Sequence, residues 1–362
     1  MITAPTLLLN EQICRRNINN MSEKAERNNV TLRPHFKTHQ SHEIGRWFRE
    51  AGTEKITVSS LRMAKYFAED DWKDIFVAFP VNILEIETIN QLAGKVHLSL
   101  LVESVEAVNF LQIHLQSPVD IYIKVDAGLH RTGISWDDHK AFNDILRSLD
   151  KSPVTNFRGF VTHSGHSYRA RSINESSVIH NESITRMLSL KNRYLKEYPG
   201  LIISVGDTPG CSIMEDFSMV DEIRPGNYVF YDITQSIIGS CTPDRIAVAM
   251  ACPVVATHKE RNEIVIYGGS VHFAKDSVAD TNGITIYGKV VRNSGNGWGE
   301  IIDGSYLKKL SQEHGIVYLP DSHINDYKPG DIIKILPVHS CTTANLMKEY
   351  LTVDGRRIKM MV

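Results

Sequence analysis

Polar clusters that contain reactive residue types follow several apolar runs of the chain. The first cluster, Arg33–His39, reads Arg-Pro-His-Phe-Lys-Thr-His and contains Lys37. The neighbouring Arg33, His35 and His39 and partial burial would lower the pKa of this lysine and expose a nucleophilic amine. Lys37 is therefore a candidate nucleophile. The simpler alternative is a solvated surface lysine, since most lysines are exposed.

Two glycine-containing clusters are candidates for binding a phosphate group. Gly206–Gly210 reads Gly-Asp-Thr-Pro-Gly, and Arg224–Asn227 reads Arg-Pro-Gly-Asn. Glycine allows close approach to the backbone, the hydroxyl of Thr208 can donate a hydrogen bond, and free N–H groups at a helix start attract an anion. Ordinary turn chemistry explains the same glycines and prolines about as well.

A candidate metal pair lies near the C-terminal end, where His339 and Cys341 follow the apolar run Asp331–Val338. If extended backbone continues through this segment, the two side chains share a face and could bind one ion. The pair is a weak motif by itself, because a buried structural cysteine accounts for it too.

The elements that must position these clusters follow an alternating pattern. Short runs rich in β-branched residues alternate with stretches of helical period, which predicts a parallel sheet. The runs are Thr31–Pro34, Lys55–Val58, Asp74–Phe79, Val96–Leu101, Val119–Val125, Phe157–Thr162, Leu201–Val205 and Asp221–Arg224. The helical stretches are Asn17–Asn28, His42–Ala51, Leu61–Ala68, Ile83–Leu92, Ser104–Leu115, Asp137–Leu149 and Glu175–Tyr198.

This pattern matches the size of a (β/α)8 barrel of the TIM type, whose active sites form at the carboxyl ends of the strands. The polar clusters fall at those ends. A doubly wound open sheet is the alternative fold. Such a sheet usually carries a glycine-rich turn after its first strand, and this chain has none there.

After about Thr234 the pattern changes to apolar alternation, which predicts an antiparallel β domain. Its expected strands are Arg245–Thr257, Glu263–Tyr267, Ile284–Val291, Gly315–Leu319 and Asp331–Val338. Thr6–Leu9 could pair with this domain. We therefore predict a barrel over residues 10–234 and a β domain formed by residues 1–9 and 235–362.

Composition narrows the possible partners. Lys and Arg number 40 and Asp and Glu number 42, for a net charge of −2, with no basic block. Nucleic acid is therefore not an expected partner. No apolar run reaches the roughly 18 residues needed to cross a bilayer, so no membrane partner is expected either. The start of the chain lacks a signal-peptide pattern, and the 5 scattered cysteines form no CxxC pair. We expect a cytoplasmic protein without a disulfide framework.

Taken together, the motifs resemble those of the D-threonine aldolase and eukaryotic-type D-serine dehydratase family. The matching segments are Arg33–His39, Gly165–Tyr168, Gly206–Pro209, Arg224–Tyr228 and His339–Cys341. The resemblance extends over nearly the whole chain from Thr6 onward. It implies a fold type III pyridoxal phosphate (PLP) enzyme with the alanine racemase fold, a divalent metal, a small D-amino acid as substrate and a homodimer.

The resemblance also implies roles for individual residues. Lys37 matches the lysine that holds the cofactor, Arg131 the arginine near the ring oxygen, and Arg224 the arginine near the ring nitrogen. The residues that match the phosphate-binding positions are Thr208, Gly226 and Asn227. The residues that match the side chains beside the substrate are His166 and Tyr168, which are the further catalytic candidates, with Tyr168 also expected to bind the cofactor.

His339 and Cys341 match the metal pair of the family. Aldolase members generally carry His-x-Asp at this place and dehydratases carry His-x-Cys, so the resemblance favours dehydration here. A thiolate with an imidazole favours zinc, and manganese and magnesium are the alternatives. Zinc lowers the pKa of bound water from about 15.7 to about 7, which is the activation that a departing hydroxyl group needs.

Two chemical routes start from a D-3-hydroxy amino acid. In dehydration Lys37 is the base for the α-proton, and the products are a 2-oxo acid and ammonia. In retro-aldol cleavage His166 is the base for the hydroxyl proton, and the products are glycine and an aldehyde. D-serine, D-threonine and 3-hydroxyaspartate all fit the sequence as substrates.

Two further functions are possible. Single-domain relatives of the barrel carry PLP without a well-defined substrate, but residues 235–362 and the metal pair argue against such a carrier. The other function is a metal-independent racemase, which would use Lys37 and an opposed acid.

Overall fold

The computed structural model describes residues 2–280 and 282–362, and the chain forms two compact units. The barrel unit comprises residues 20–37 and 48–226, and the β unit comprises residues 1–19, 38–47 and 227–362. This division differs from the predicted one mainly at residues 10–19 and 38–47. Segment 38–47 belongs to the β unit because its side chains bond to residues near the C-terminus: Gln40 Nε2 donates to Asn345 Oδ1 at 3.1 Å, and Arg356 to Glu43 at 2.7 Å.

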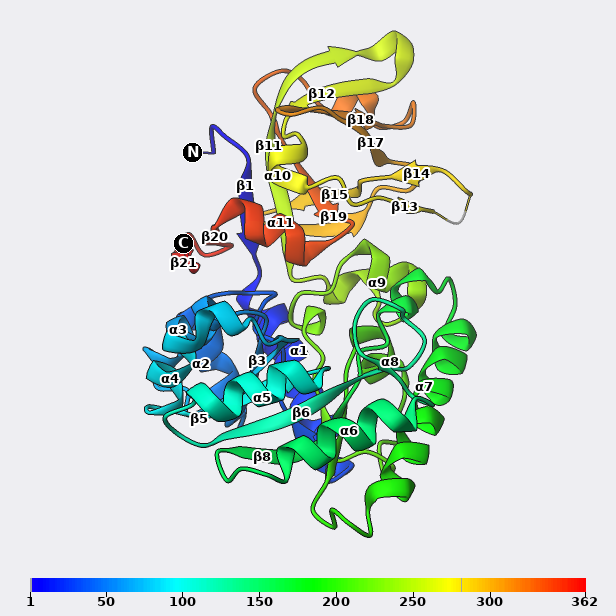
Figure 1. Ribbon diagram of the computed structural model, residues 1–362. Helices are drawn as coiled ribbons and strands as arrows, with labels where there is room; N and C mark the ends of the chain where they lie inside the picture. The colour runs from blue at the N-terminus through cyan, green and yellow to red at the C-terminus, as the bar shows by residue number, and fades with distance from the viewer. Residues whose placement is uncertain (1, 281) are drawn as a thin grey trace. The chain divides into compact units, whose positions relative to one another are not determined.

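Eight parallel strands form the frame of the barrel unit (Figure 1). They are β2 (Thr31–Leu32), β3 (Lys55–Val58), β4 (Asp74–Pro80), β5 (His97–Val102), β6 (Val119–Asp126), β8 (Thr155–Val161), β9 (Ile202–Val205) and β10 (Glu222–Ile223). Their order in the sheet is β2-β10-β9-β8-β6-β5-β4-β3, and the short β7 (Ile134–Ser135) pairs with β6. All eight predicted runs are strands.

Hydrogen bonds close the sheet between its first and last strands. A parallel bridge joins His35 to Thr57, the Phe36 N–H donates to the Thr57 carbonyl at 2.9 Å, and the Thr57 N–H donates to the Pro34 carbonyl at 2.9 Å. The predicted TIM-type barrel is confirmed, and the alternative of an open doubly wound sheet is excluded.

Helices lie around the outside of these strands, and their starts follow ordinary capping chemistry (Figure 1). They are α3 (Leu61–Ala68), α4 (Ile86–Ala93), α5 (Val105–His114), α6 (His139–Leu149), α7 (Ile173–Tyr194) and α8 (Thr208–Ile213). Ser60, Ser104 and Ser172 each accept a hydrogen bond from a backbone N–H three residues later, at the starts of α3, α5 and α7. Two further helices, α1 (Glu11–Arg27) and α2 (His42–Glu50), contain residues of both units.

Among the described residues, the β unit contains an antiparallel-rich sheet of ten strands, as predicted, and a separate sheet of two short strands. Its strands are β1 (Thr6–Leu9), β11 (Val248–His258), β12 (Glu263–Tyr267), β13 (Val278–Ala279), β14 (Thr285–Ile286), β15 (Gly288–Ser294), β16 (Gly297–Ile301), β17 (Tyr306–Leu310), β18 (His314–Tyr318), β19 (Ile332–Pro337), β20 (Glu349–Thr352) and β21 (Arg357–Lys359). Strand β1 pairs with β11 in antiparallel register, Thr6 opposite Ala251, which confirms the predicted pairing of Thr6–Leu9 with this domain.

Some strands of the β unit were not predicted from the sequence pattern. Strands β13, β16, β17, β20 and β21 were not predicted, since they are short and mostly half-exposed. The helices of this unit are α9 (Ile233–Ile238), α10 (Ser270–Phe273) and α11 (Ser340–Met347). No helix in the described part of the chain is both long and apolar enough to cross a membrane.

Gly159 allows β8 and β9 to approach closely, and we predict that Gly159→Ala destabilises the barrel. A Cβ atom at this position would lie 2.0 Å from the Ile202 carbonyl oxygen, which is backbone and cannot move aside alone. We expect the free energy of unfolding to fall by about 2–3 kcal/mol, as for other overpacked sites. Thermal unfolding followed by circular dichroism measures the loss. Gly200→Ala is the matched control, because nothing lies within 4 Å of its added Cβ; equal melting temperatures of the two variants would refute the prediction.

Candidate active site

A cavity of about 350 Å³ lies in the barrel unit and is lined largely by residues at or after the carboxyl ends of its strands. The lining residues are His35, Lys37, Ser59, Ala78, Phe79, Pro80, Leu101, Lys124, Arg131, Thr132, Val161, His163 and Arg224. Three predicted cofactor residues, Lys37, Arg131 and Arg224, are thus brought together. The concentration of cationic side chains makes the cavity suitable for an anionic ligand.

Arg224 is held at the cavity by a buried polar network. Its Nε donates to Ser204 Oγ at 2.7 Å and its Nη2 to the Thr162 carbonyl at 2.5 Å. Ser204 Oγ in turn donates to Glu222 Oε1 at 2.6 Å. Burial lowers the pKa of Arg224 to about 10, so the guanidinium remains charged at neutral pH.

Arg33 belongs to a buried ion-pair network inside the barrel. It is buried and pairs with two carboxylates: its Nε lies 2.6 Å from Glu222 Oε2, and its Nη1 lies 2.6 Å from Asp74 Oδ1. These carboxylates compensate its charge inside the barrel. Arg33 is therefore a structural residue of the barrel.

His39 is also structural. It is fully buried, its Nδ1 accepts from the Ser41 N–H at 3.2 Å, and its carbonyl accepts from Tyr350 Oη at 2.8 Å. Burial lowers the pKa of His39 to about 3, so the ring carries no charge at neutral pH. Of the groups expected around Lys37, only His35 lines the same cavity.

His35 and His163 line the cavity as neutral rings. Burial and the positive charge of Lys37 lower the pKa of both far below its usual value. His163 Nδ1 lies 2.5 Å from the Gly206 carbonyl, which only accepts, so Nδ1 carries the proton. The Nε2 atom of His163 is left as a hydrogen-bond acceptor.

Lys124 is a cavity residue that the sequence reasoning missed. It lies on β6 and is buried, and its Nζ donates to the Val125 carbonyl at 3.2 Å. Burial, with the nearby Arg224 and Arg131, lowers the pKa of Lys124 to about 7. The available signal was its position, since it is the one lysine in the mostly apolar strand-like run Val119–Val125.

Arg131 lies on a loop whose shape is set by hydrogen bonds from its backbone N–H groups to two carboxylates. Asp126 Oδ1 accepts from the N–H groups of Gly128 and His130, at 2.9 and 3.0 Å. Glu103 Oε2 accepts from the Gly133 N–H at 2.6 Å. The two carboxylates fix both ends of the loop, and so limit where Arg131 can lie.

Thr208 has the features of a phosphate-binding residue, although it does not line the cavity. Its hydroxyl oxygen is buried and makes no hydrogen bond within the described residues. The Thr208 N–H is 3.3 Å from Tyr168 Oη. A Cβ at Gly206 would lie 2.9 Å from the Arg224 backbone, so only glycine fits there. An unsatisfied buried hydroxyl beside a close-packed glycine loop fits an oxyanion ligand.

The other predicted residues of the barrel unit, His166, Tyr168 and Gly226, do not line the cavity either. His166 lies against the loop of Arg131, because a Cβ at Gly128 would be 3.7 Å from its Nε2. Burial lowers the pKa of His166, and its Nδ1 is buried without a hydrogen bond among the described residues. His166 is therefore a neutral ring that can still accept a proton.

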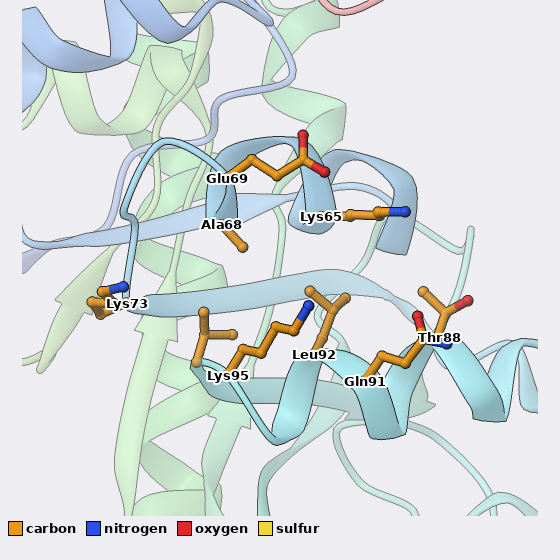
Figure 2. A pocket seen from close by; sticks show the side chains of 9 residues that line it. Lys65, Ala68, Glu69, Lys73, Thr88, Gln91, Leu92 and Lys95 are labelled. Carbon is orange, nitrogen blue, oxygen red and sulfur yellow. The ribbon is translucent and has the colours of Figure 1, made fainter.

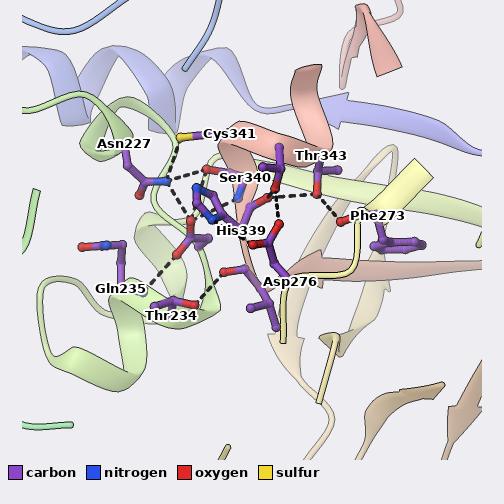
Figure 3. Close-up of polar contacts among 12 residues, drawn as sticks. Asn227, Thr234, Gln235, Phe273, Asp276, His339, Ser340, Cys341 and Thr343 are labelled. Carbon is purple, nitrogen blue, oxygen red and sulfur yellow. Dashed lines mark hydrogen bonds and ion pairs between the residues drawn. The ribbon is translucent and has the colours of Figure 1, made fainter. Parts of the chain in front are cut away.

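The metal pair of the β unit has a backbone that differs from the expected one (Figure 3). Strand β19 ends at Pro337, and α11 begins at Ser340 with His339 as its N-cap residue. The expectation of continued extended backbone is thus wrong. His339 and Cys341 nevertheless share a side-chain hydrogen bond. Burial alone would lower the pKa of His339, but Asp276 and Cys341 together raise it to about 11.

Asn227 was expected to bind phosphate, and its side chain instead joins the surroundings of the metal pair. Its Nδ2 lies 2.7 Å from Asp232 Oδ2, 2.9 Å from Ser340 Oγ and 3.4 Å from Cys341 Sγ. Its Oδ1 is buried and has no hydrogen-bond partner in the described part of the chain. Asn227 therefore supports the segment that carries Cys341.

A second cavity of about 410 Å³ lies between α3 and α4 (Figure 2). Lys65, Lys73 and Lys95 line it, and all three are exposed. Lys73 directly precedes β4, and Lys95 lies two residues before β5, so this cavity is at the amino ends of the strands. Active sites of such barrels form at the opposite ends, and we do not assign the function to it.

Glu222 links Arg33 to Arg224, and we predict that Glu222→Gln strongly destabilises the barrel. Removing one partner of a buried ion pair leaves an uncompensated charge, which costs about 3–5 kcal/mol. Chemical unfolding of the two proteins measures the difference. Glu182→Gln serves as the control, because Glu182 is an exposed partner of Arg186 and should leave stability unchanged. Unchanged stability of Glu222→Gln would show that the network is not needed for the fold.

Two family models match most of the chain. The model of the alanine racemase N-terminal domain matches residues 9–233, and the model of a putative serine dehydratase domain matches residues 247–353.

Individual relatives match over the full length. The chain is 27% identical over 391 residues to a D-serine dehydratase from Dictyostelium discoideum, with 98% of this chain and 94% of the relative covered. It is 26% identical over 367 residues to D-threo-3-hydroxyaspartate dehydratase from Delftia sp., with 98% and 95% covered. A solved structure of that Delftia enzyme superimposes with a TM-score of 0.91 at 25% identity, covering 100% of this chain and 98% of the other. The chain therefore belongs to the alanine racemase-fold family of PLP-dependent lyases that includes the D-serine dehydratases and D-threonine aldolases.

Proposed function

We propose that this protein is a PLP-dependent, metal-activated lyase of the D-serine dehydratase type, which dehydrates a D-3-hydroxy amino acid. The observation that carries the proposal is that Lys37, Arg131 and Arg224 line one cavity in the barrel unit. Relatives named D-serine dehydratase, from Dictyostelium discoideum and Schizosaccharomyces pombe, support the choice of reaction, at 27% and 25% identity.

The residues of the barrel unit fit PLP. Lys37 supplies the amine that holds it, Arg131 the donor for its ring oxygen, and Arg224 the donor for its ring nitrogen. Thr208, with its unsatisfied hydroxyl, and Gly226 and Asn227 would bind the phosphate through hydroxyl and backbone groups. When bound, PLP supplies an electron sink for negative charge at the substrate α-carbon.

The charge of Arg224 determines which kind of group its guanidinium can contact on the PLP ring. A guanidinium has only donors, and this one remains charged at neutral pH, so its partner nitrogen must be an acceptor. The buried contacts to Ser204 and Thr162 hold the guanidinium in place. Arg224 therefore binds and orients the ring, and it transfers no proton.

Lys37 has two roles in the proposed reaction. Its amine would hold the cofactor, and the same amine, once free, would remove the proton from the substrate α-carbon. The neutral His35 and His163 add no positive charge beside it. Departure of the β-hydroxyl then gives an enamine, which hydrolyses to a 2-oxo acid and ammonia.

His339 and Cys341 would hold the metal, and their imidazole and thiolate favour zinc over manganese or magnesium. The metal supplies activation of the departing hydroxyl group. Thr38, whose hydroxyl lies 3.2 Å from Cys341 Sγ, directly follows Lys37 in the chain.

The Delftia relative supports the metal assignment. Its solved structures include a histidine-to-alanine variant and a cysteine-to-alanine variant two positions apart, the latter in a metal-free form. His339 and Cys341 have the same spacing. Among the residues that the structure describes, no group of three His, Cys, Asp or Glu could hold a metal, so water or substrate would complete the coordination.

Retro-aldol cleavage is the second candidate. His166 is neutral and keeps an unpaired buried Nδ1 among the described residues, as a base for a substrate hydroxyl requires. A D-threonine aldolase from Arthrobacter sp. is 22% identical over 98% of this chain. Cys341 in place of a carboxylate favours dehydration. The β unit and its metal pair disfavour a plain PLP carrier and a metal-independent racemase.

The proposal extends to assembly and location. We propose a homodimer, as the family resemblance implies, which size-exclusion chromatography with light scattering would test. We also propose a cytoplasmic location, because all five cysteines are free thiols.

Product analysis tests the reaction. The purified protein is incubated with D-serine, D-threonine or D-threo-3-hydroxyaspartate, after chelation and after addition of zinc or manganese. We expect ammonia and a 2-oxo acid from at least one substrate, loss of turnover on chelation, and recovery with metal. Glycine and an aldehyde as products would replace dehydration with the aldolase reaction.

Substitution of the proposed metal ligand His339 tests whether the metal serves dehydration and not the binding of PLP. His339→Ala should lower the rate of dehydration at least about 100-fold, because the hydroxyl then departs without metal activation. The visible absorbance of bound PLP should remain, since no ligand of the cofactor has changed. His314→Ala, an exposed histidine of the same unit, should leave both readouts unchanged. Full lyase activity in His339→Ala would disprove the metal assignment.

A further inference from the structure

The two proposed metal ligands have different polar neighbours: groups that can donate lie near Cys341, and an acceptor lies near His339 (Figure 3). Cys341 Sγ has two neighbours that can donate, Thr38 Oγ1 at 3.2 Å and Asn227 Nδ2 at 3.4 Å. Donors stabilise a thiolate, which is the form that binds a metal. The surroundings of the sulphur thus favour its ligating state.

His339 has an acceptor instead. Its Nδ1 lies 3.6 Å from Asp276 Oδ1, within the range of an ion pair. A carboxylate only accepts, so it favours the tautomer with the proton on Nδ1. In that tautomer Nε2 carries the free lone pair that a metal requires.

Asp276 is itself held in place. Its Oδ2 accepts from Thr342 Oγ1 at 2.7 Å, and Thr342 directly follows Cys341. Thr343 Oγ1 donates to the Phe273 carbonyl at 3.1 Å, which ties the end of α10 to α11. The Asp276 carboxylate therefore contacts His339, just before α11, and Thr342, within α11, on either side of Cys341 in the chain.

We propose that Asp276 is a positioning residue for the metal site: it orients His339 through Nδ1 and leaves Nε2 to bind the metal. The inference rests on the proposed function of His339 and Cys341. Metal-bound histidines commonly donate their other ring N–H to a carboxylate, and loss of such a partner lowers metal affinity 10–100-fold. Asp276 faces His339 with one oxygen and Thr342 with the other, as a residue that orients the histidine requires.

Metal affinity tests this role without reference to turnover. Zinc binding to the whole protein is measured by competition with a chromophoric chelator, and cobalt binding by the thiolate-to-cobalt absorption band. We expect Asp276→Ala to bind both metals 10–100-fold more weakly than the wild type. The metal affinity of Asp276→Asn should lie between those of Asp276→Ala and the wild type, because its side-chain oxygen can still accept from Nδ1 but carries no charge.

Asp326→Ala is the matched control. Asp326 Oδ2 lies 2.7 Å from His323 Nδ1, another Asp–His pair of the β unit, and its loss should leave metal affinity unchanged. Should Asp276→Ala fail to fold by circular dichroism, Thr342→Val removes the anchor of the carboxylate and should weaken binding in the same direction.

The outcomes distinguish a failure of the positioning role of Asp276 from a failure of the metal pair itself. Wild-type affinity in Asp276→Ala, with a wild-type protein that does bind zinc, overturns the positioning role and leaves the metal pair intact. A wild-type protein that binds neither zinc nor cobalt overturns the metal pair and with it the role of Asp276.

Discussion

A buried chain of polar contacts inside the barrel is the constraint on which the rest of the structure depends. Arg33 cannot be buried without compensation, and Glu222 and Asp74 provide it from two other strands. Glu222 also accepts from Ser204, which in turn accepts from Arg224. The ion pairs that stabilise the barrel therefore also fix the orientation of a cavity arginine. Fold and site share one network, so the site cannot shift without exposing an unpaired charge.

The sequence predicted much of this arrangement because the rules that apply are local or topological. Strand-like runs and helical periods are read over short windows, and in a barrel all carboxyl ends lie on one face. Together with the family resemblance, that reasoning gave Lys37, Arg131 and Arg224 as cofactor residues, and all three line one cavity. It did not reveal the buried contacts of Arg33 and His39, because their partners lie 41 to 311 residues away in the chain and no local pattern indicates them.

The misses in the β unit have a similar cause. Extended backbone was expected to continue to Cys341 because apolar alternation precedes this segment, but α11 starts at Ser340, whose N–H donates to the distant Asp232. Asp276 stands in a segment without any motif, and its significance comes only from contacts with His339 and Thr342. Lys124 is the exception, since a lysine within a mostly apolar strand-like run can be recognised from the sequence alone.

The central claim is that PLP is held by Lys37, although the cavity contains a second lysine, Lys124, whose lowered pKa also makes its amine reactive. Reduction of the PLP-loaded protein with borohydride, followed by proteolysis and mass spectrometry, tests this claim most directly. The account predicts a pyridoxyl label on the peptide that contains Lys37. A label on Lys124 or on another lysine, with Lys37 unmodified, would contradict it.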